Sequence, residues 1–434
     1  MKIVIVGGGA AGMFASIAAS SNSENEVIIL EKNEKLGKKL FITGKGRCNV
    51  TNNCSREEFF KNIVKNPKFM YSAFSLFSNI ELKKIIEDNG CPLKVERGNR
   101  VFPVSDKSSD IINTLKRIIN KNGVKVYLNS IVKNIKKESN GFNICYDNNS
   151  EKNKCINADK VIIATGGLSY PLTGSTGDGY IIAKKFDLKV NPQYPSLVPF
   201  NIKESSLCKD MQGLTLKNVA IKIYEKDNIK NIIYKDFGEM LFTHFGVSGP
   251  IILSASCYIE NDSNKEYILS IDLKPALSEK ELDLRLLREF ANYKQKKLKN
   301  IMTTLLPGKM IKIFLDRLSE SINEKRNDKK ENASYVDVEN INIADTDKSI
   351  RKEIINLLKN FDFTILSKRG FDEAVITRGG IDVGELNPKT MECKKVKDLY
   401  FAGEVIDVDA LTGGFNIQIA ATTGYTAGYE AGKI

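Results

Sequence analysis

Residues 2–31 read KIVIVGGGAAGMFASIAASSNSENEVIILE, and this stretch decides the fold of the chain. A short apolar strand pattern leads into a glycine turn, a helix of small residues follows, and a second strand pattern ends on Glu31. In such a unit Gly7 makes the tight turn, Gly9 lets bare backbone approach a pyrophosphate, and Gly12 lets the helix pack closely on the strand. The order predicts a Rossmann-like site for a dinucleotide.

Both the ribose and the phosphates of a dinucleotide find partners in this unit. Glu31 follows Gly12 by 19 residues, at the place where an acidic side chain meets the hydroxyls of the adenosine ribose. The helix that begins near Ala10 offers its N–H groups and the positive end of its dipole to the phosphates. We expect the cofactor contacts here to come from Gly7, Gly9, Ala10, Ala11, Gly12, Glu31 and Lys32.

A secretory signal is the rival interpretation of the N-terminus, because Lys2 precedes an apolar stretch. Three consecutive glycines would break the apolar helix of such a signal, and the strand pattern VIIL follows where a cleavage site would stand. No run of 18 apolar residues offers a membrane span. We therefore expect a cytoplasmic protein that does not enter a membrane.

Composition sets broad limits. The 434 residues, 42% of them hydrophobic, suffice for two or three domains with sizeable cores. The net charge of +12 would suit a polyanionic partner such as nucleic acid. An AT-rich genome accounts for the same charge, since 53 lysines stand against 12 arginines. Both explanations stay open.

Cysteine usage gives no sign of a metal or a disulfide framework. No CxxC pair and no zinc spacing occurs among Cys48, Cys54, Cys91, Cys145, Cys155, Cys208, Cys257 and Cys393. We expect reduced thiols and no metal site.

The middle of the chain differs in texture from its two ends. Alternating strand patterns begin near residue 191, and Ser278 with Glu281 forms a capping box that predicts a helix. The charged stretch at 321–332 predicts a surface loop. The last sixty residues are again rich in small side chains. We therefore predict an α/β fold with a cofactor domain at 1–190 and 374–434, an inserted β-barrel at 191–275, helices at 276–345, and a return to the barrel at 346–373.

A second cofactor signature closes the chain. The strand pattern LYFAG is followed by Glu404, and Gly413 and Gly414 precede a helix that starts near Phe415 or Asn416. A flavin needs a carboxylate for its ribitol hydroxyls and a helix N-terminus for the ring edge that becomes negative on reduction. The C-terminal segment supplies both, so the sequence indicates FAD rather than NAD at this site.

Five longer strings specify the family. They are GRCNVTN (46–52), ATGGLSYPLTGSTGDGY (164–180), LFTHFGVSGP (241–250), VITRGGI (375–381) and FAGEVIDVDALTGGFNIQIA (401–420). In this order they resemble the BaiN/RdsA family of FAD-dependent oxidoreductases, also called YhiN-like flavoproteins, over nearly the whole chain. The resemblance implies a two-part, Rossmann-like FAD domain of the two-dinucleotide-binding type, with an inserted β-barrel and a small helical subdomain. It also implies reduction of conjugated C=C bonds, such as steroid enones or a uracil of ribosomal RNA, or oxidation of aminoacetone.

Several further residues are candidates for the flavin site. The loop at 43–54 is expected to face the flavin, with Arg47 or Asn49 orienting the ring; the five residues between Cys48 and Cys54 do not match the CxxxxC dithiol of disulfide reductases. The strand at 160–163 ends on a turn that should touch cofactor. The remaining predicted cofactor residues are Lys39, Thr43, Gly44, Gly46, Arg47, Cys48, Asn49, Ala164, Thr165, Gly166, Gly167, Gly403, Glu404, Gly413, Gly414, Phe415 and Asn416.

Candidates for a catalytic proton donor are fewer. His244 is the single histidine of the chain, and an imidazole that titrates near neutral pH serves well as a general acid. A lone histidine has a structural role as often. Cys48 and Tyr170 are weaker candidates of the same kind.

The sequence leaves the substrate open. We prefer a hydride transfer from NAD(P)H, through the flavin, to a uridine of ribosomal RNA. No second GxGxxG follows a strand, so a nicotinamide would dock directly over the flavin. The alternatives are a small-molecule enone reductase or amine oxidase, and a flavin-containing RNA-binding factor without turnover.

Overall fold

The computed structural model describes residues 1–149, 151–259, 265–328 and 336–433. Within it the chain divides into two compact units. The first unit joins Met1–Leu197 to Gly370–Ile434, and the second is Val198–Arg369. The two ends of the chain therefore build one unit, and the middle builds another.

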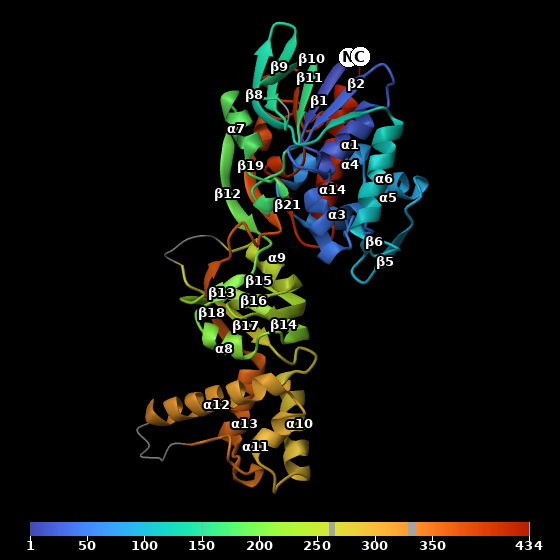
Figure 1. Ribbon diagram of the computed structural model, residues 1–434. Helices are drawn as coiled ribbons and strands as arrows, with labels where there is room; N and C mark the ends of the chain where they lie inside the picture. The colour runs from blue at the N-terminus through green and yellow to red at the C-terminus, as the bar shows by residue number, and fades with distance from the viewer. Residues whose placement is uncertain (150, 260–264, 329–335, 434) are drawn as a thin grey trace. The chain divides into compact units, whose positions relative to one another are not determined.

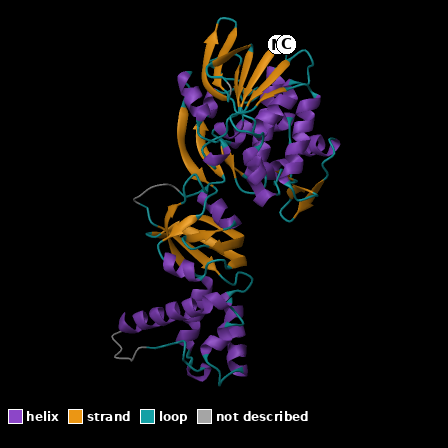
Figure 2. Cartoon of the chain, viewed as in Figure 1, coloured by secondary structure: helices purple, strands orange, loops and turns teal. Residues whose placement is uncertain are grey.

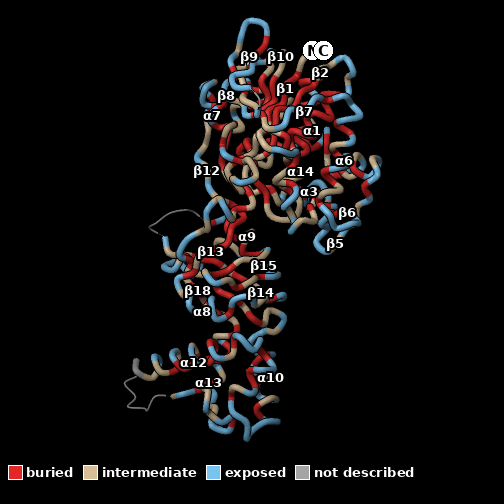
Figure 3. Tube along the Cα trace, in the orientation of Figure 1, coloured by how far each residue is buried: buried red, intermediate tan, exposed pale blue. Residues whose placement is uncertain are grey.

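A five-stranded parallel sheet is the centre of the first unit (Figure 1). Its order is β20 (Leu399–Phe401), β11 (Lys160–Ile163), β1 (Lys2–Val6), β2 (Glu26–Leu30) and β7 (Lys125–Tyr127). β1 and β2 are coloured as buried along almost their whole length (Figure 3). Runs of β-branched side chains without polar alternation are typical of parallel strands that are covered on both faces.

Two helices from opposite ends of the chain pack backbone to backbone beside this sheet. α1 (Ala10–Ala19) and α14 (Phe415–Ala431) meet along rows of alanine and glycine. A Cβ atom at Gly424 would lie 2.2 Å from the carbonyl oxygen of Ala11, and one at Gly428 would lie 2.0 Å from that of Ala15. Any side chain at these glycines would force the helices apart.

Smaller elements complete the first unit. Short sheets form from β3 with β6 and β5, from β10 with β9 and β8, from β12 with β19, and from β21 with β4. The strands are β3 (Thr51–Asn52), β4 (Ile63–Lys65), β5 (Leu93–Glu96), β6 (Arg100–Pro103), β8 (Ile131–Glu138), β9 (Gly141–Asp147), β10 (Lys154–Ala158), β12 (Val190–Ser196), β19 (Ile376–Ile381) and β21 (Asp409–Ala410). The helices are α2 (Lys38–Ile42), α3 (Arg56–Lys61), α4 (Tyr71–Leu76), α5 (Asn79–Asp88), α6 (Ser108–Lys121) and α7 (Asp178–Lys185).

One pair of thiols departs from the expectation of reduced cysteines. Cys145 on β9 and Cys155 on β10 form a disulfide. The two residues are direct cross-strand partners, with Cα atoms 4.1 Å apart. Their spacing in the sequence gave no signal, because the pairing depends on the register of the two strands.

The second unit contains a closed barrel of six strands (Figure 2). Around the barrel the order is β13 (Phe200–Ile202), β16 (Gly246–Ser248), β15 (Asn228–Phe242), β14 (Thr215–Glu225), β17 (Tyr267–Asp272) and β18 (Phe361–Lys368). α8 (Ser205–Asp210) and α9 (Pro250–Ser256) belong to the same segment. The core of the unit includes Phe200, Phe242, Phe361 and Phe363, which are buried.

The other helices of the second unit lie between β17 and β18 in sequence. They are α10 (Glu279–Asn292), α11 (Leu298–Met302), α12 (Gly308–Asp328) and α13 (Lys348–Lys359). The predicted capping box is present, since the Ser278 and Glu281 side chains bond each other's backbone N–H groups at the start of α10. The predicted loop at 321–332 is wrong for residues 321–328, which continue α12, and its remainder lies outside the described residues.

Strand pairing shifts two of the predicted boundaries. The break expected at residue 191 falls inside β12, which pairs antiparallel with β19 of the first unit. The segment at 346–373 begins with α13, which packs on α10 and α12 before β18 rejoins the barrel. None of the helices in the described ranges is both long and apolar enough to cross a membrane.

The contact between α1 and α14 predicts a strong effect of one methyl group. Alanine favours a helix by about 1 kcal/mol over glycine, yet the new Cβ of Gly428→Ala would lie 2.0 Å from the Ala15 oxygen. Overpacking of this kind costs about 1–3 kcal/mol beyond that gain. We expect a lower melting temperature for the first unit by calorimetry. Gly370→Ala is the control, since a Cβ there meets no atom within 4 Å; equal melting of both variants would contradict the assignment.

Candidate functional site

The glycine turn between β1 and α1 has the geometry that a phosphate cradle needs. Gly7 has φ +106°, and a Cβ on it would lie 2.4 Å from the Ala164 oxygen. A Cβ on Gly12 would lie 1.9 Å from the Gly7 oxygen, whereas one on Gly9 would meet no atom within 4 Å. Gly7 and Gly12 are therefore required by close packing, and Gly9 borders open space. No side chain caps the first turn of α1, so its N–H groups stay available to an anion.

Glu31 holds this turn together. Its Oε2 accepts a hydrogen bond of 2.6 Å from the Gly8 N–H, and its Oε1 accepts from the backbone and side-chain nitrogens of Asn33 at 2.8 and 2.7 Å. The side chain is buried. The next residue, Lys32, forms an ion pair of 2.7 Å with Asp178. The carboxylate thus fixes the glycine turn, and its further lone pairs are the kind of acceptor that ribose hydroxyls need.

Glu404 stands at the other predicted end of the site, where three segments converge. Its Oε2 lies 2.6 Å from the Lys39 ammonium, and its Oε1 accepts from the Ser169 hydroxyl at 2.7 Å and the Thr377 N–H at 2.8 Å. Burial alone would raise the pKa of Glu404. Lys39 and these hydrogen bonds outweigh burial and hold that pKa below its ordinary value. The group is therefore a carboxylate at neutral pH.

The turn that opens α14 is built from two glycines with positive φ. Gly413 has φ +122°, Gly414 has φ +96°, and a Cβ on Gly414 would lie 2.5 Å from the Thr51 oxygen. No side chain caps the helix. Asn416 is turned to the backbone, since its amide bonds the N–H and oxygen of Ala410 at 2.9 and 2.7 Å. Asn416 therefore shapes the turn, and the backbone N–H groups remain for a ligand.

Arg47, a candidate for orienting the flavin ring, has acidic and aromatic partners within the protein. Its guanidinium pairs with Glu96 and Asp106 and lies 4.1 Å from the centre of the Phe102 ring. These partners belong to β5, β6 and the turn after β6. Arg47 thus ties the loop to a hairpin, and its charge is used there.

Cys48 is also poorly suited to the predicted chemistry. The thiol is fully buried, and burial raises its pKa to about 12. A thiol of that pKa is neither a thiolate nucleophile nor an effective acid at neutral pH. Cys48 and Cys54 are separate thiols in the structure.

Two side chains of the predicted site have buried oxygen atoms without a hydrogen-bond partner. They are Asn49 Oδ1 and Thr165 Oγ1. Buried polar atoms are rarely left in this state unless a ligand or water completes them. Together with the open space at Gly9 and the uncapped start of α14, they fit a long dinucleotide with a polar ring at one end. The residues present therefore fit FAD.

The other predicted residues lie in the same segments. Thr43, Gly44 and Gly46 form a 3-10 turn before Cys48. Ala164, Gly166 and Gly167 follow β11, and a Cβ on Gly167 would lie 2.9 Å from Glu404 Oε1. Gly403 precedes Glu404, and Phe415 begins α14. Tyr170 follows Ser169, has φ +52° and donates its backbone N–H to the Phe371 oxygen. Burial raises the pKa of Tyr170.

His244 lies in the second unit, on the turn between β15 and β16. It is exposed, and its ring packs edge to face against Phe245 at 5.0 Å. The guanidinium of Arg369 covers that phenylalanine at 4.4 Å. Its proposed role as an acid stays a prediction.

Sequence reasoning missed a group of buried charges in the first unit. Asp407 and Asp409 are buried; Lys65 lies 2.7 Å from Asp407, and Arg378 lies 3.3 Å from Asp409. Burial raises the pKa of Asp409, with Arg378 opposing it. The string VITRGGI contains Arg378, and DVDAL contains Asp407 and Asp409. The available signal in the sequence was therefore charged residues within apolar, glycine-containing strings. Across the described ranges, no three His, Cys, Asp or Glu side chains gather as a metal site.

The pKa of Glu404 leads to a pH-dependent prediction. Because the folded-state pKa is lowered, the carboxylate stabilises the fold above its ordinary pKa of about 4.3, and this contribution is lost as the pH falls through the lower folded value. Glu404→Gln should lower the free energy of unfolding at pH 7 by about 1.5–3 kcal/mol, the typical contribution of a hydrogen bond to a charged group. Thermal melts should show the gap to the wild type closing below about pH 4.

Glu34→Gln is the matched control, since Glu34 pairs with Lys38 at the surface and such pairs contribute little. A gap for Glu404→Gln that persists unchanged down to pH 3 would count against the ion pair.

Comparisons with known proteins identify the family of the chain. The model of the HI0933-like protein Rossmann domain matches residues 1–430. A ribosomal RNA dihydrouridine synthase of Haemophilus influenzae is 30% identical over 97% of this chain and 96% of its own length. The 3-dehydro-bile acid delta(4,6)-reductase of Clostridium scindens is 28% identical over 100% of this chain and 99% of its own.

Solved structures share the fold at lower identity. Escherichia coli quinol fumarate reductase matches with a TM-score of 0.50 and 15% identity, over 100% of this chain and 70% of its own. A 3-ketosteroid delta1-dehydrogenase of Sterolibacterium denitrificans matches with a TM-score of 0.50 and 11% identity, over 99% of each chain. The chain belongs to the HI0933-like family, the BaiN/RdsA-type FAD-dependent oxidoreductases that its motifs indicate.

Proposed function

We propose that this protein holds FAD along its first unit and reduces an electron-poor C=C bond. The adenosine and pyrophosphate would lie at the Gly7–Gly12 turn and Glu31, and the flavin end at Glu404 and the first turn of α14. One observation carries this proposal: the two half-sites come from opposite ends of the chain, and the α1–α14 contact locks them into one unit.

The protein's own contribution is charge and orientation. FAD, when bound, would accept a hydride from a reduced nicotinamide and deliver it to the C=C bond. The uncapped N-terminus of α14 places positive potential at one end of the site. Glu404, held ionised by Lys39, offers an acceptor for hydroxyl groups. We propose NAD(P)H as the donor, docking directly at the flavin because the sequence contains no second GxGxxG after a strand.

We propose a uridine of ribosomal RNA as the substrate. Two relatives that match over nearly their whole length are named ribosomal RNA dihydrouridine synthases. The net charge of +12 suits a polyanion. Lysines at 294–299 of the second unit offer phosphate contacts, although Lys297 and Lys299 also reach Asn340 and Glu339.

A small-molecule enone is the second candidate. The relative from Clostridium scindens, named a bile acid reductase, also matches over its whole length. A conjugated enone and the C5=C6 bond of uracil both accept a hydride at the carbon β to a carbonyl. The same site therefore serves either substrate, and the residues around the substrate decide between them.

An in vitro assay distinguishes the candidates. The FAD-loaded full chain should lose its flavin absorbance on anaerobic mixing with NADH or NADPH, and should then form dihydrouridine in protein-free ribosomal RNA, measured by mass spectrometry of nucleosides. Failure of both donors would contradict the proposed reductant. Reoxidation by a steroid enone without any dihydrouridine would favour the second candidate, and RNA binding without flavin reduction would favour a non-catalytic factor.

Substitution of the single histidine tests the proton donor. If His244 supplies the proton, His244→Asn should leave reduction by NAD(P)H unchanged and slow reoxidation by substrate about 10²- to 10⁴-fold. Rapid mixing separates the two half-reactions. Tyr170→Phe serves as the comparison variant, because it removes the phenolic hydroxyl that is also a candidate for this role. Equal reoxidation by His244→Asn and wild type would contradict the assignment.

A further inference from the structure

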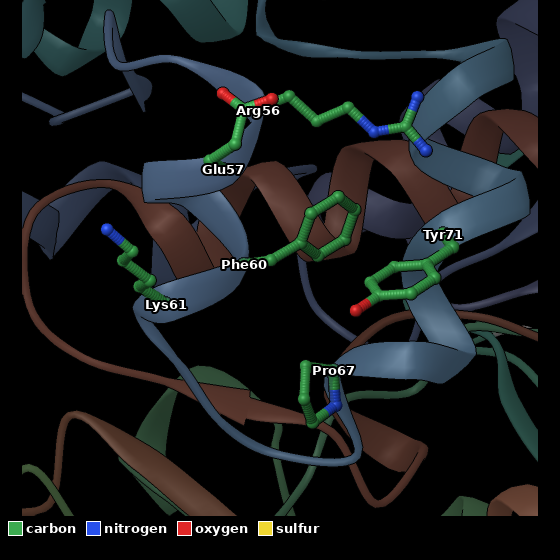
Figure 4. A pocket seen from close by; sticks show the side chains of 6 residues that line it. All are labelled: Arg56, Glu57, Phe60, Lys61, Pro67 and Tyr71. Carbon is green, nitrogen blue, oxygen red and sulfur yellow. The ribbon is translucent and has the colours of Figure 1, made fainter.

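A cavity of about 410 Å³ opens on the first unit beside α3 and α4, outside the segments that form the FAD site. Figure 4 shows its lining, in which two aromatic rings and a proline are combined with charged side chains. The volume lies within the range of small-ligand sites. The lining residues are Arg56, Glu57, Phe60, Lys61, Pro67 and Tyr71.

The aromatic rings of this cavity are arranged to accept a further ring. Tyr71 is 44% exposed, so part of its side chain is open to a ligand. Phe60 and Tyr71 meet edge to face with centroids 4.5 Å apart. An edge-to-face pair covers a face of only one of its two rings, so a flat ligand finds a stacking surface.

Cations stand beside these rings. The Arg56 guanidinium lies 5.6 Å from the centre of the Phe60 ring and has no carboxylate partner among the described residues. Lys61 is 75% exposed and 4.0 Å from its nearest acid, Glu58. Figure 4 shows the Arg56 guanidinium on the same side of the cavity as Tyr71, with Glu57 and Lys61 on the other side. A base on the rings would therefore have a cation near its phosphate.

We propose that this cavity binds one nucleotide of single-stranded RNA, with its base stacked on Tyr71, its edge toward Phe60 and its phosphate against Arg56. Aromatic stacking next to a cation is how proteins hold unpaired bases. Glu57 supplies an acceptor for a base N–H group, as the imide of uracil offers. The proposal rests on the proposed RNA substrate and names where a nucleotide that flanks the reacting uridine is held.

The position of the cavity fits this role. A chain of ring contacts leads from it to the FAD site: Phe60 lies 5.5 Å from Phe59, and Phe59 lies 5.9 Å from Phe415, the first residue of α14. β4, which follows α3, also pairs with β21, four residues before that helix. A strand of RNA with its reactive base at the flavin would extend a neighbouring nucleotide toward these rings.

Binding of a fluorescein-labelled octauridylate to the FAD-loaded full chain, followed by anisotropy, tests the proposal. Tyr71→Leu should weaken binding about 5- to 140-fold, the loss of one stacked base, and Tyr71→Phe should stay within about twofold. Arg56→Gln should lower the slope of log affinity against log salt by about 0.7, one phosphate contact. FAD content and NAD(P)H oxidation should not change.

Matched controls exist on the same unit. Tyr429 is 41% exposed with Lys433 at 4.5 Å from its ring and is not among the residues that line this cavity, and Lys84 is an exposed lysine on α5. Tyr429→Leu and Lys84→Gln should bind like the wild type. Equal binding by Tyr71→Leu and wild type would overturn the proposal. Displacement of the probe by polyglutamate or NADH that occurs only when Tyr71 is present would also overturn it.

Turnover separates this inference from the proposed substrate. Weaker binding in Tyr71→Leu supports the cavity even if the wild type makes no dihydrouridine in ribosomal RNA. Full binding and full dihydrouridine formation by Tyr71→Leu would contradict the proposed role of the cavity and leave the proposed function standing.

Discussion

The backbone contact between α1 and α14 is the constraint on which the cofactor site depends. Gly424 and Gly428 face the carbonyl oxygens of Ala11 and Ala15, and there is no room for a side chain between them. A Cβ on Gly403 would also lie 2.7 Å from that of Ala11. The turn that carries Glu404 is thus pressed against the helix that begins at the glycine cradle, so residues some 400 positions apart in sequence are placed by one interface.

Both predicted acids of the site have hydrogen-bond partners within the protein itself. Glu31 accepts from the Gly8 N–H, and Glu404 accepts from Thr377 and Ser169 while facing Lys39. Each carboxylate is held in one orientation by bonds that exist without a cofactor. Such preorganisation lowers the cost of ordering the site when a ligand binds. Gly9 has an ordinary φ of −77°, which any residue can adopt, so its importance lies in the open space beside it.

Local patterns in the sequence predicted much of this structure. Pairings between residues that are distant in the sequence could not be predicted from it. The capping box at Ser278 and the glycine turn at Gly7 are local, so their residues sufficed. The extension of α12 past residue 320 was not predicted, because a polar, charged helix resembles a solvated loop in composition. The disulfide between Cys145 and Cys155 depends on strand register. The ion pairs of Arg47 with Glu96 and Asp106 could not be predicted either, because these partners lie about fifty residues away in sequence.

The same distinction governs what the positive charge means. Many cations have a partner within the fold: Lys65 faces Asp407, Lys94 faces Asp106, and Lys32 faces Asp178. Each of these ion pairs contributes nothing to the net charge, because its acid cancels its cation. The net charge of +12 therefore counts only the excess of cations over acids and does not say where those cations lie. What distinguishes a binding site is a cation beside an uncovered aromatic ring, because that pair recognises a base and a phosphate together, and Arg56 with Tyr71 meets this condition.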